Sequence, residues 1–142
     1  MLAHHFIKRT SLSHAPLLIA LLMNGCASSS PVCLPGMHPI VLDSLYFGTA
    51  KPGGAVTDQE WTTFLKDTVG AEFPDGLTFW MAHGRWRDAN GSVAAEPSHV
   101  LQLAHDGSQE RERGLQRIIH TYKSWFHQDA VMRIRSQVCR SF

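Results

Sequence analysis

The sequence predicts an α+β domain of the ferredoxin-like type, in which four strands and two helices follow one another in the order β-α-β-β-α-β. Two observations support this order. Segments that alternate between apolar and polar residues indicate four strands, and two segments with apolar residues at i, i+3, i+4 and i+7 indicate two helices. Two helices and a four-stranded antiparallel sheet form two layers, so we expect both helices to cover one face of the sheet.

Local signals mark the first strand and the first helix. Residues 40–49 alternate in polarity and stop at the turn-forming residues 51–54 (Lys-Pro-Gly-Gly). Residues 57–60 (Thr-Asp-Gln-Glu) have the spacing of a capping box, in which the first and last side chains bond each other's backbone amides. Apolar residues recur with helical spacing from Trp61, and Gly70 is a typical C-terminal cap. We therefore predict a helix that ends at about residue 70.

The middle of the chain predicts a β-hairpin. Residues 77–87 are rich in strand-forming residues, and residues 88–91 (Asp-Ala-Asn-Gly) are typical of a tight turn because Asn-Gly tolerates positive φ. Glu96-Pro97 marks the edge of the returning strand, since proline cannot donate a hydrogen bond to a neighbouring strand. We expect the returning strand to cover residues 98–105.

The end of the chain predicts a second helix and a closing strand. Residues 106–108 (Asp-Gly-Ser) are typical of a helix start, and an apolar stripe between Leu115 and Phe126 carries the helix to about His127. Residues 130–138 alternate in polarity again, which predicts the fourth strand.

The alternation assigns side chains to the two faces of the sheet. The helix-covered face is expected to carry Leu45, Phe47, Phe79, Met81, Leu101, Leu103, Met132 and Ile134. The face without helices is expected to present Tyr46, Trp80, Gln102, Arg133 and Arg135, with Trp86 near the end of its strand. Exposed aromatic side chains form a patch that monomers tend to avoid. A second copy of the chain, the N-terminal linker or a ligand should therefore cover this face, and the two arginines would bind a ligand carboxylate.

Asp43 is an acid on the helix-covered face. A carboxylate in this register is buried, and a buried carboxylate requires a partner. We expect an arginine or a histidine on a neighbouring strand to supply it.

The N-terminus has the features of an export signal. Lys8 and Arg9 precede an apolar run at 15–23, which is shorter than the about 20 residues of a membrane-spanning helix. Residues 22–26 (Leu-Met-Asn-Gly-Cys) resemble a bacterial lipobox, so we predict a signal peptide at 1–25 and a lipid on Cys26. Cleavage after Ala27 remains the alternative. The resemblance implies an outer-membrane lipid anchor facing the periplasm, and the alternative implies a soluble periplasmic or secreted protein.

The remaining cysteines agree with export. Residues 26–39 contain the candidate lipidated Cys26 and small residues, proline and glycine without periodicity, so they are expected to form a linker before a single domain at 40–142. Cys33 and Cys139 form an even pair once Cys26 is set aside. In an oxidising compartment such a pair favours a disulfide between the two ends of the chain.

Composition narrows the function classes. The 142 residues are 18% charged and 44% hydrophobic, with a net charge of +1. The first 25 residues hold two Lys or Arg and no acid, so the remainder has a net charge of −1. A chain of this charge is not expected to bind nucleic acid.

Several short motifs carry a family resemblance. These motifs are 45–48 (Leu-Tyr-Phe-Gly), 73–78 (Phe-Pro-Asp-Gly-Leu-Thr), 84–87 (Gly-Arg-Trp-Arg), 96–98 (Glu-Pro-Ser), 138–139 (Val-Cys) and the terminal Ser141-Phe142. They resemble a bacterial family catalogued as domain of unknown function 3574. The resemblance implies an exported protein, and because the family has no assigned activity it identifies no catalytic residue.

The sequence contains no motif for a cofactor, a metal ion or a catalytic nucleophile. It lacks the G-x-S-x-G and phosphate-loop patterns, and His99 and His105 are about 20 Å apart if they lie on one strand. Two functions follow. The first is a non-enzymatic envelope lipoprotein that acts through self-association or a protein partner. The alternative is a small-ligand binder or cofactor-free enzyme of the dimeric α+β-barrel kind that uses the face of Tyr46, Trp80 and Arg133.

Overall fold

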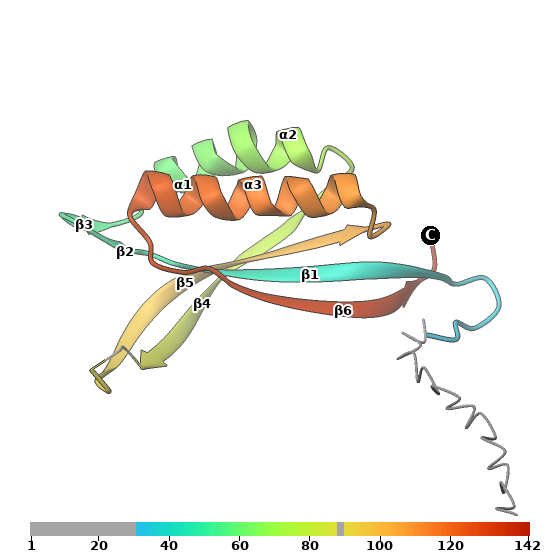
Figure 1. Ribbon diagram of the computed structural model, residues 1–142, viewed down its shortest axis with the longest axis horizontal. Coiled ribbons are helices and arrows are strands. Elements are labelled where there is room, and N and C mark those ends of the chain that lie inside the picture. Colours follow the sequence, from blue (N-terminus) through green and yellow to red (C-terminus); the bar gives the residue numbers. More distant parts are fainter. Residues whose placement is uncertain (1–30, 88–89) are drawn as a thin grey trace, which may run out of the picture.

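The computed structural model describes residues 31–87 and 90–142 (Figure 1). The predicted signal peptide, Cys26 and the first part of the linker lie outside these residues. The elements are β1 (His38–Gly48), β2 (Ala50–Lys51), β3 (Gly54–Ala55), α1 (Asp58–Phe64), the π-helical turn η1 (Leu65–Val69), α2 (Gly70–Glu72), β4 (Thr78–Arg87), β5 (Val93–His105), α3 (Gln109–Phe126) and β6 (Met132–Arg140).

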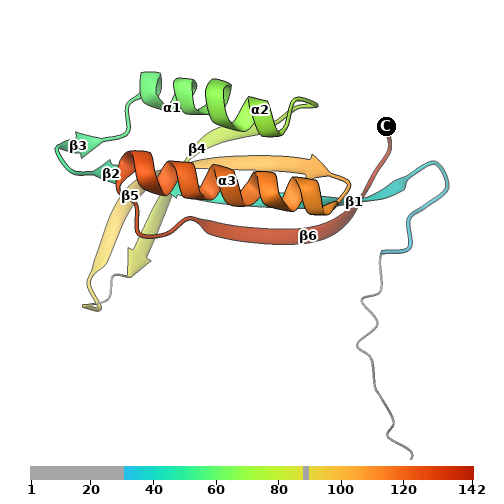
Figure 2. The same cartoon turned by 45° about the horizontal axis from the view of Figure 1, so that its top comes forward.

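The main sheet is antiparallel and has the strand order β4-β5-β1-β6. The segment α1–η1–α2 and α3 both lie on one face of this sheet (Figures 1 and 2). This is the predicted ferredoxin-like arrangement, with two helical segments on one face of four strands. Among the described residues, no helix combines the length and apolar character needed to cross a bilayer.

The first helical segment begins as predicted and ends later. Thr57 and Glu60 form the capping box, with the Thr57 side chain accepting from the Glu60 amide. The predicted end at Gly70 is wrong, because Gly70 has helical φ of −63° and its amide donates to the carbonyl of Leu65. The π-helical turn extends the segment, so that Val69 and, after it, Phe73 enter the core.

The returning strand of the hairpin is longer than predicted. β5 begins at Val93 rather than at Ser98 and passes through Pro97, which pairs with His83 of β4. The pairing of β1 with β5 ends at Ser98, so Pro97 has a strand partner on one side only and its missing amide hydrogen costs little. Residues 83–87 and 93–97 therefore form a two-stranded arm beyond the main sheet (Figure 1).

The core lies between the helices and the central strands. Phe47 of β1 is its centre, because its ring lies 5.4 Å from Trp61 and 4.5 Å from Tyr122. The Tyr122 hydroxyl donates to the carbonyl of Gly48 at 2.8 Å, which ties α3 to β1. The buried hydrophobic residues are Leu45, Phe47, Val56, Trp61, Phe64, Leu65, Val69, Phe73, Val100, Leu101, Leu103, Leu115, Ile118, Tyr122 and Phe126.

The predicted faces are correct for three strands and wrong for β6. Arg133 lies opposite Leu45, and Arg135 lies opposite Asp43, so both arginines are on the helix-covered face. Met132 and Ile134 consequently lie on the other face. Alternation does not specify which set points inward, and a shift of one residue exchanges the faces of a whole strand.

The predicted core also includes two residues of β4 that the structure shows to be exposed. Phe79 and Met81 lie opposite Leu101 and His99 on the helix-covered face, but they are 49% and 54% exposed because β4 is an edge strand.

The disulfide between Cys33 and Cys139 is present, with 5.7 Å between the two Cα atoms. It joins the segment before β1 to the end of β6. A closed loop of about 100 residues is stabilised by roughly 4–5 kcal/mol in the chain-entropy description. The bridge therefore fixes both ends of the domain at one place.

Candidate functional site

The sheet face without helices is the candidate site, and its apolar residues form what we call the open strip: Tyr46, Trp80, Val100, Met132 and Ile134. Strand pairing places Trp80 beside Val100, Val100 beside Tyr46, and Tyr46 beside Met132, so that one row crosses all four strands. Ile134 lies in the next row, opposite Ser44. Figure 2 shows that both helical segments lie on the other side of the sheet.

The open strip is apolar and partly bare. Trp80 is 42% exposed, Met132 39% and Ile134 47%. Val100 is buried although no helix lies over it, because its neighbours in the row cover it. Strands about 4.8 Å apart make such a row about 15 Å long. Contiguous apolar surface of this kind is typical of an interaction site.

The polar groups of this face bond each other. Gln102 donates from its side-chain amide to the Ser44 hydroxyl at 3.2 Å. Tyr46, Trp80 and Gln102 therefore lie where the sequence predicts. Trp86 lies in the arm opposite Ala94, and its side chain is outside what the structure describes.

The open-face placement predicted for Arg133 and Arg135 is wrong, so they do not supply a carboxylate site beside Tyr46 and Trp80.

A hollow of about 390 Å³ lies at one end of the open strip. Its lining is Tyr46, Gly48, Arg87, Glu96, Gln128, Asp129, Ala130, Val131 and Met132.

The arginines instead serve the buried carboxylate of Asp43. Arg133 donates to both oxygens of Asp43, from Nε at 2.7 Å and from Nη2 at 3.1 Å. His105 lies 2.8 Å from the second oxygen through its Nε2. The backbone amide of Gly107 donates to His105 Nδ1 at 3.1 Å, so Nε2 carries the proton of the neutral ring and donates to Asp43. The expectation of an arginine or histidine partner on a neighbouring strand is confirmed.

The same arginines connect the sheet to α3. Arg133 reaches both carboxylate oxygens of Glu112 at 2.7 Å, and Arg135 donates to Glu112 at 3.2 Å. Arg135 also lies 3.6 Å from Asp43. Two acids and two arginines thus balance in charge between β1, β6 and α3.

The pKa values of both acids are lowered. Burial alone would raise the pKa of Asp43, but the hydrogen bonds from Arg133 and His105 outweigh it and hold the pKa below its usual value. The hydrogen bonds of Glu112 to Arg133 and Gln116 lower its pKa to about 2. Because every atom of this cluster that would transfer a proton is already bonded, the cluster is suited to holding the fold together. The sequence indicates Asp43 but not its partners, since their assembly depends on the register of β6.

The two buried histidines of β5 have separate roles. His99 stacks on Trp61 with 4.1 Å between ring centroids, and burial lowers its pKa. His105 belongs to the Asp43 cluster. Within residues 31–87 and 90–142, no group of three or more His, Cys, Asp or Glu is arranged to hold a metal ion.

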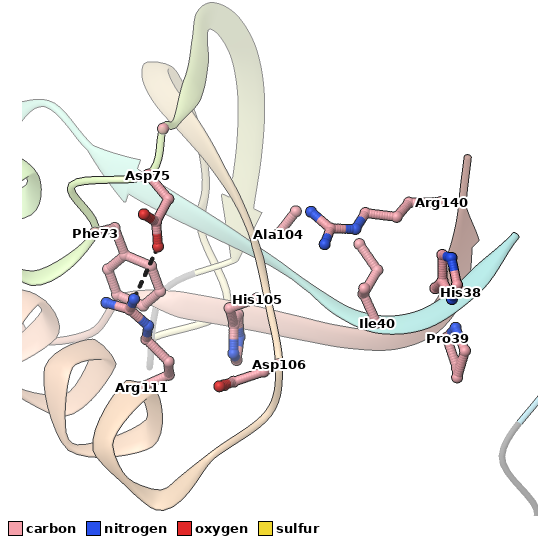
Figure 3. A pocket seen from close by; sticks show the side chains of 11 residues that line it. His38, Pro39, Ile40, Phe73, Asp75, Ala104, His105, Asp106, Arg111 and Arg140 are labelled. Atoms are coloured by element: carbon pink, nitrogen blue, oxygen red, sulfur yellow. Dashed lines mark hydrogen bonds and ion pairs between the residues drawn. The ribbon is translucent and has the colours of Figure 1, made fainter. Parts of the chain in front are cut away.

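A cavity of about 560 Å³ lies where β5 ends (Figure 3). Arg111 stands over the Phe73 ring at 5.4 Å and donates to Asp75 at 2.9 Å and to the Glu72 carbonyl at 2.6 Å. Its guanidinium is therefore already occupied. Arg140, on the opposite side of the cavity, makes no ion pair with any described residue. The remaining lining residues are His38, Pro39, Ile40, Gly76, Ala104, His105 and Asp106.

Solved structures of a phage SAM lyase resemble this fold. The lyase in complex with S-methyl-5′-thioadenosine has a TM-score of 0.55 and 14% identity, over 71% of this chain and 88% of that chain. The apo lyase has a TM-score of 0.54 and 16% identity, over 79% and 91%. At these identities the similarity concerns the fold alone.

No curated protein matches the sequence. A family match covers residues 43–142, and the description of that family is "Protein of unknown function (DUF3574)". This range includes all the long strands and helices of the domain except the first residues of β1. The chain therefore belongs to the DUF3574 family.

Proposed function

We propose that the chain is an exported, lipid-anchored envelope protein whose domain acts by binding a second copy of itself through the open strip. The observation that carries the proposal is the partly exposed apolar row that crosses all four strands with no helix over it. Water contact with Trp80, Met132 and Ile134 is unfavourable, at about 25 cal/mol per Å² of apolar surface. The lipobox-like segment that ends at Cys26 and the disulfide support the envelope address.

A second copy fits the open strip better than a small charged ligand does. The strip is long, shallow and without charge, whereas small-ligand sites are concave and contain a few convergent polar groups. Face-to-face packing of two sheets, about 10 Å apart, would cover both strips symmetrically. A ligand carboxylate would find neither arginine available on this face. Arg133 and Arg135 lie on the helix-covered face and are already bonded to acids.

Sedimentation velocity of the mature protein tests the association. We expect a concentration-dependent dimer that Ile134→Glu converts to a monomer, because the new carboxylate would lose water without gaining a partner. Met81→Glu is the matched control, since Met81 is as exposed but lies on the other face. A protein that stays monomeric at high concentration, or a dimer that survives Ile134→Glu and dissociates with Met81→Glu, would contradict the proposal.

Metabolic labelling with palmitate tests the anchor. Label is expected on the full chain and is expected to be lost in Cys26→Ala. Cys33→Ala, which changes a cysteine of the bridge, should retain the label. A mature N-terminus after Ala27 without any lipid would refute the anchor and leave a soluble exported protein.

A further inference from the structure

Three exposed apolar side chains lie close to the disulfide, and with Arg140 they form what we call the tether end: Val32, Leu34, Arg140 and Phe142. Val32 and Leu34 flank Cys33 and are 100% and 72% exposed. Phe142, three residues after Cys139, is 92% exposed. The bridge holds the two cysteines together, so it gathers these side chains at one end of the domain. Figures 1 and 2 show this end opposite the β4–β5 arm.

The short distance along the chain to Cys26 limits where the tether end can be. Cys33 is the seventh residue after Cys26, and an extended chain spans at most about 3.6 Å per residue, or about 25 Å over this stretch. The bridge also keeps this tether short. Because it bonds Cys33 to Cys139 of β6, the residues after Cys33 cannot detach from the sheet and add to the tether. If Cys26 carries lipid, as the proposed function requires, the tether end is the part of the domain that must remain near the bilayer.

The charges of this end also suit a phospholipid surface. Strand pairing places Arg140 opposite His38, and Arg140 makes no ion pair within the described part of the chain. A guanidinium is well matched to a phosphate group.

We infer that the tether end lies on the membrane surface, with Val32, Leu34 and Phe142 among the lipid headgroups and upper acyl chains and Arg140 beside the phosphates. This contact rests on the proposed lipid anchor and adds a second attachment to it. Three apolar side chains and one cation are a weak signal alone, but they act strongly when a lipid already holds them at the surface. The arm then points away from the bilayer.

Photo-crosslinking to lipid tests the contact. The acylated protein is reconstituted into phosphatidylethanolamine–phosphatidylglycerol vesicles that contain a phospholipid with a diazirine in its acyl chain, and adducts are mapped by peptide mass spectrometry. We expect adducts on residues 31–38 and 138–142, and few on 78–87 or 93–98. Val32→Ser/Leu34→Ser/Phe142→Ser should lower the adduct yield by roughly fivefold or more.

A matched variant separates this contact from general loss of apolar surface. Met81→Ser/Val93→Ser/Trp125→Ser removes three side chains that are each about half exposed and belong to β4, β5 and α3, and its yield should equal that of the unchanged protein. Adducts spread evenly, adducts concentrated on the open strip, or an unchanged yield in the tether-end variant would overturn the inference. Intact mass distinguishes the two failures: protein without acyl chains refutes the anchor and the contact together, whereas acylated protein without tether-end adducts refutes the contact alone.

Discussion

The two faces of β6 differ in a way that reverses the usual distribution of charge. Its inward face carries Arg133 and Arg135 among the helices, and its outward face carries Met132 and Ile134 toward water. The inward charges are fully paired, whereas the outward apolar side chains have no cover. This contrast separates two roles in one strand. The inward face stabilises the domain, and the outward face is available to a partner.

The largest expected effect is the loss of Arg133. Arg133→Met leaves the carboxylate of Asp43 buried with fewer partners, and breaking a buried pair in this way costs about 3–5 kcal/mol in the free energy of unfolding. Urea unfolding followed by circular dichroism measures it. A loss below about 1 kcal/mol would show that the inward face does not hold the domain together.

The second-largest expected effect is a loss of folding stability in acid, through the charged pairs of the inward face. The pKa values of Asp43 and Glu112 are lower in the folded protein than in the unfolded chain, where the pKa of Glu112 is 4.5 and not about 2. Their stabilisation is therefore complete above the unfolded pKa values and is lost as the pH falls from about 5 toward 2. The urea midpoint should fall over this range, and Glu112→Gln should reduce the fall. An equal fall in both proteins would remove Glu112 from the explanation.

The third prediction concerns an uncharged hydrogen bond on the helix-covered side of the sheet, between Tyr122 and Gly48. Tyr122→Phe removes the hydroxyl of a buried tyrosine that donates to the Gly48 carbonyl, and such a loss costs about 1–2 kcal/mol. Thermal unfolding of the variant gives the value. Tyr46→Phe on the open strip is the comparison, and we expect it to change stability less. Equal losses at the two tyrosines would weaken the distinction between the faces.

The smallest effect on stability is expected on the outward face. Ile134→Ser removes an exposed side chain, so the free energy of unfolding should change by no more than about 0.5 kcal/mol, while association weakens. Unfolding at a concentration below the dimer range measures the first quantity, and sedimentation measures the second. A large loss of stability in the monomer would mean that Ile134 serves the fold instead.

The features that sequence predicts well are those that depend on near neighbours. The capping box at Thr57 and Glu60, the helix start at Ser108 and the order of the elements all follow from local spacing. The bridge between Cys33 and Cys139 follows from a simple count of cysteines.

The errors arise where distant segments decide the outcome. The phase of β6 depends on Asp43, which lies about ninety residues earlier and draws the arginines inward. The early start of β5 depends on β1 ending beside Ser98, and the late end of the first helix depends on core space for Val69. The sequence therefore predicts the sheet face without helices only in part: it places Tyr46, Trp80 and Gln102 correctly, and it places Met132 and Ile134 on the wrong face.

The disulfide also determines how the domain would respond to mechanical force. If Cys26 carries a lipid, a pull from the membrane would reach Cys33 and divide there between the chain that leads into β1 and, through the bridge, Cys139 near the end of β6. Tension from this side cannot unzip the β1–β6 pair, since the bridge closes the end where separation would begin. A load from the anchor would therefore be carried by a covalent clamp, and the hydrogen bonds of the sheet would be spared.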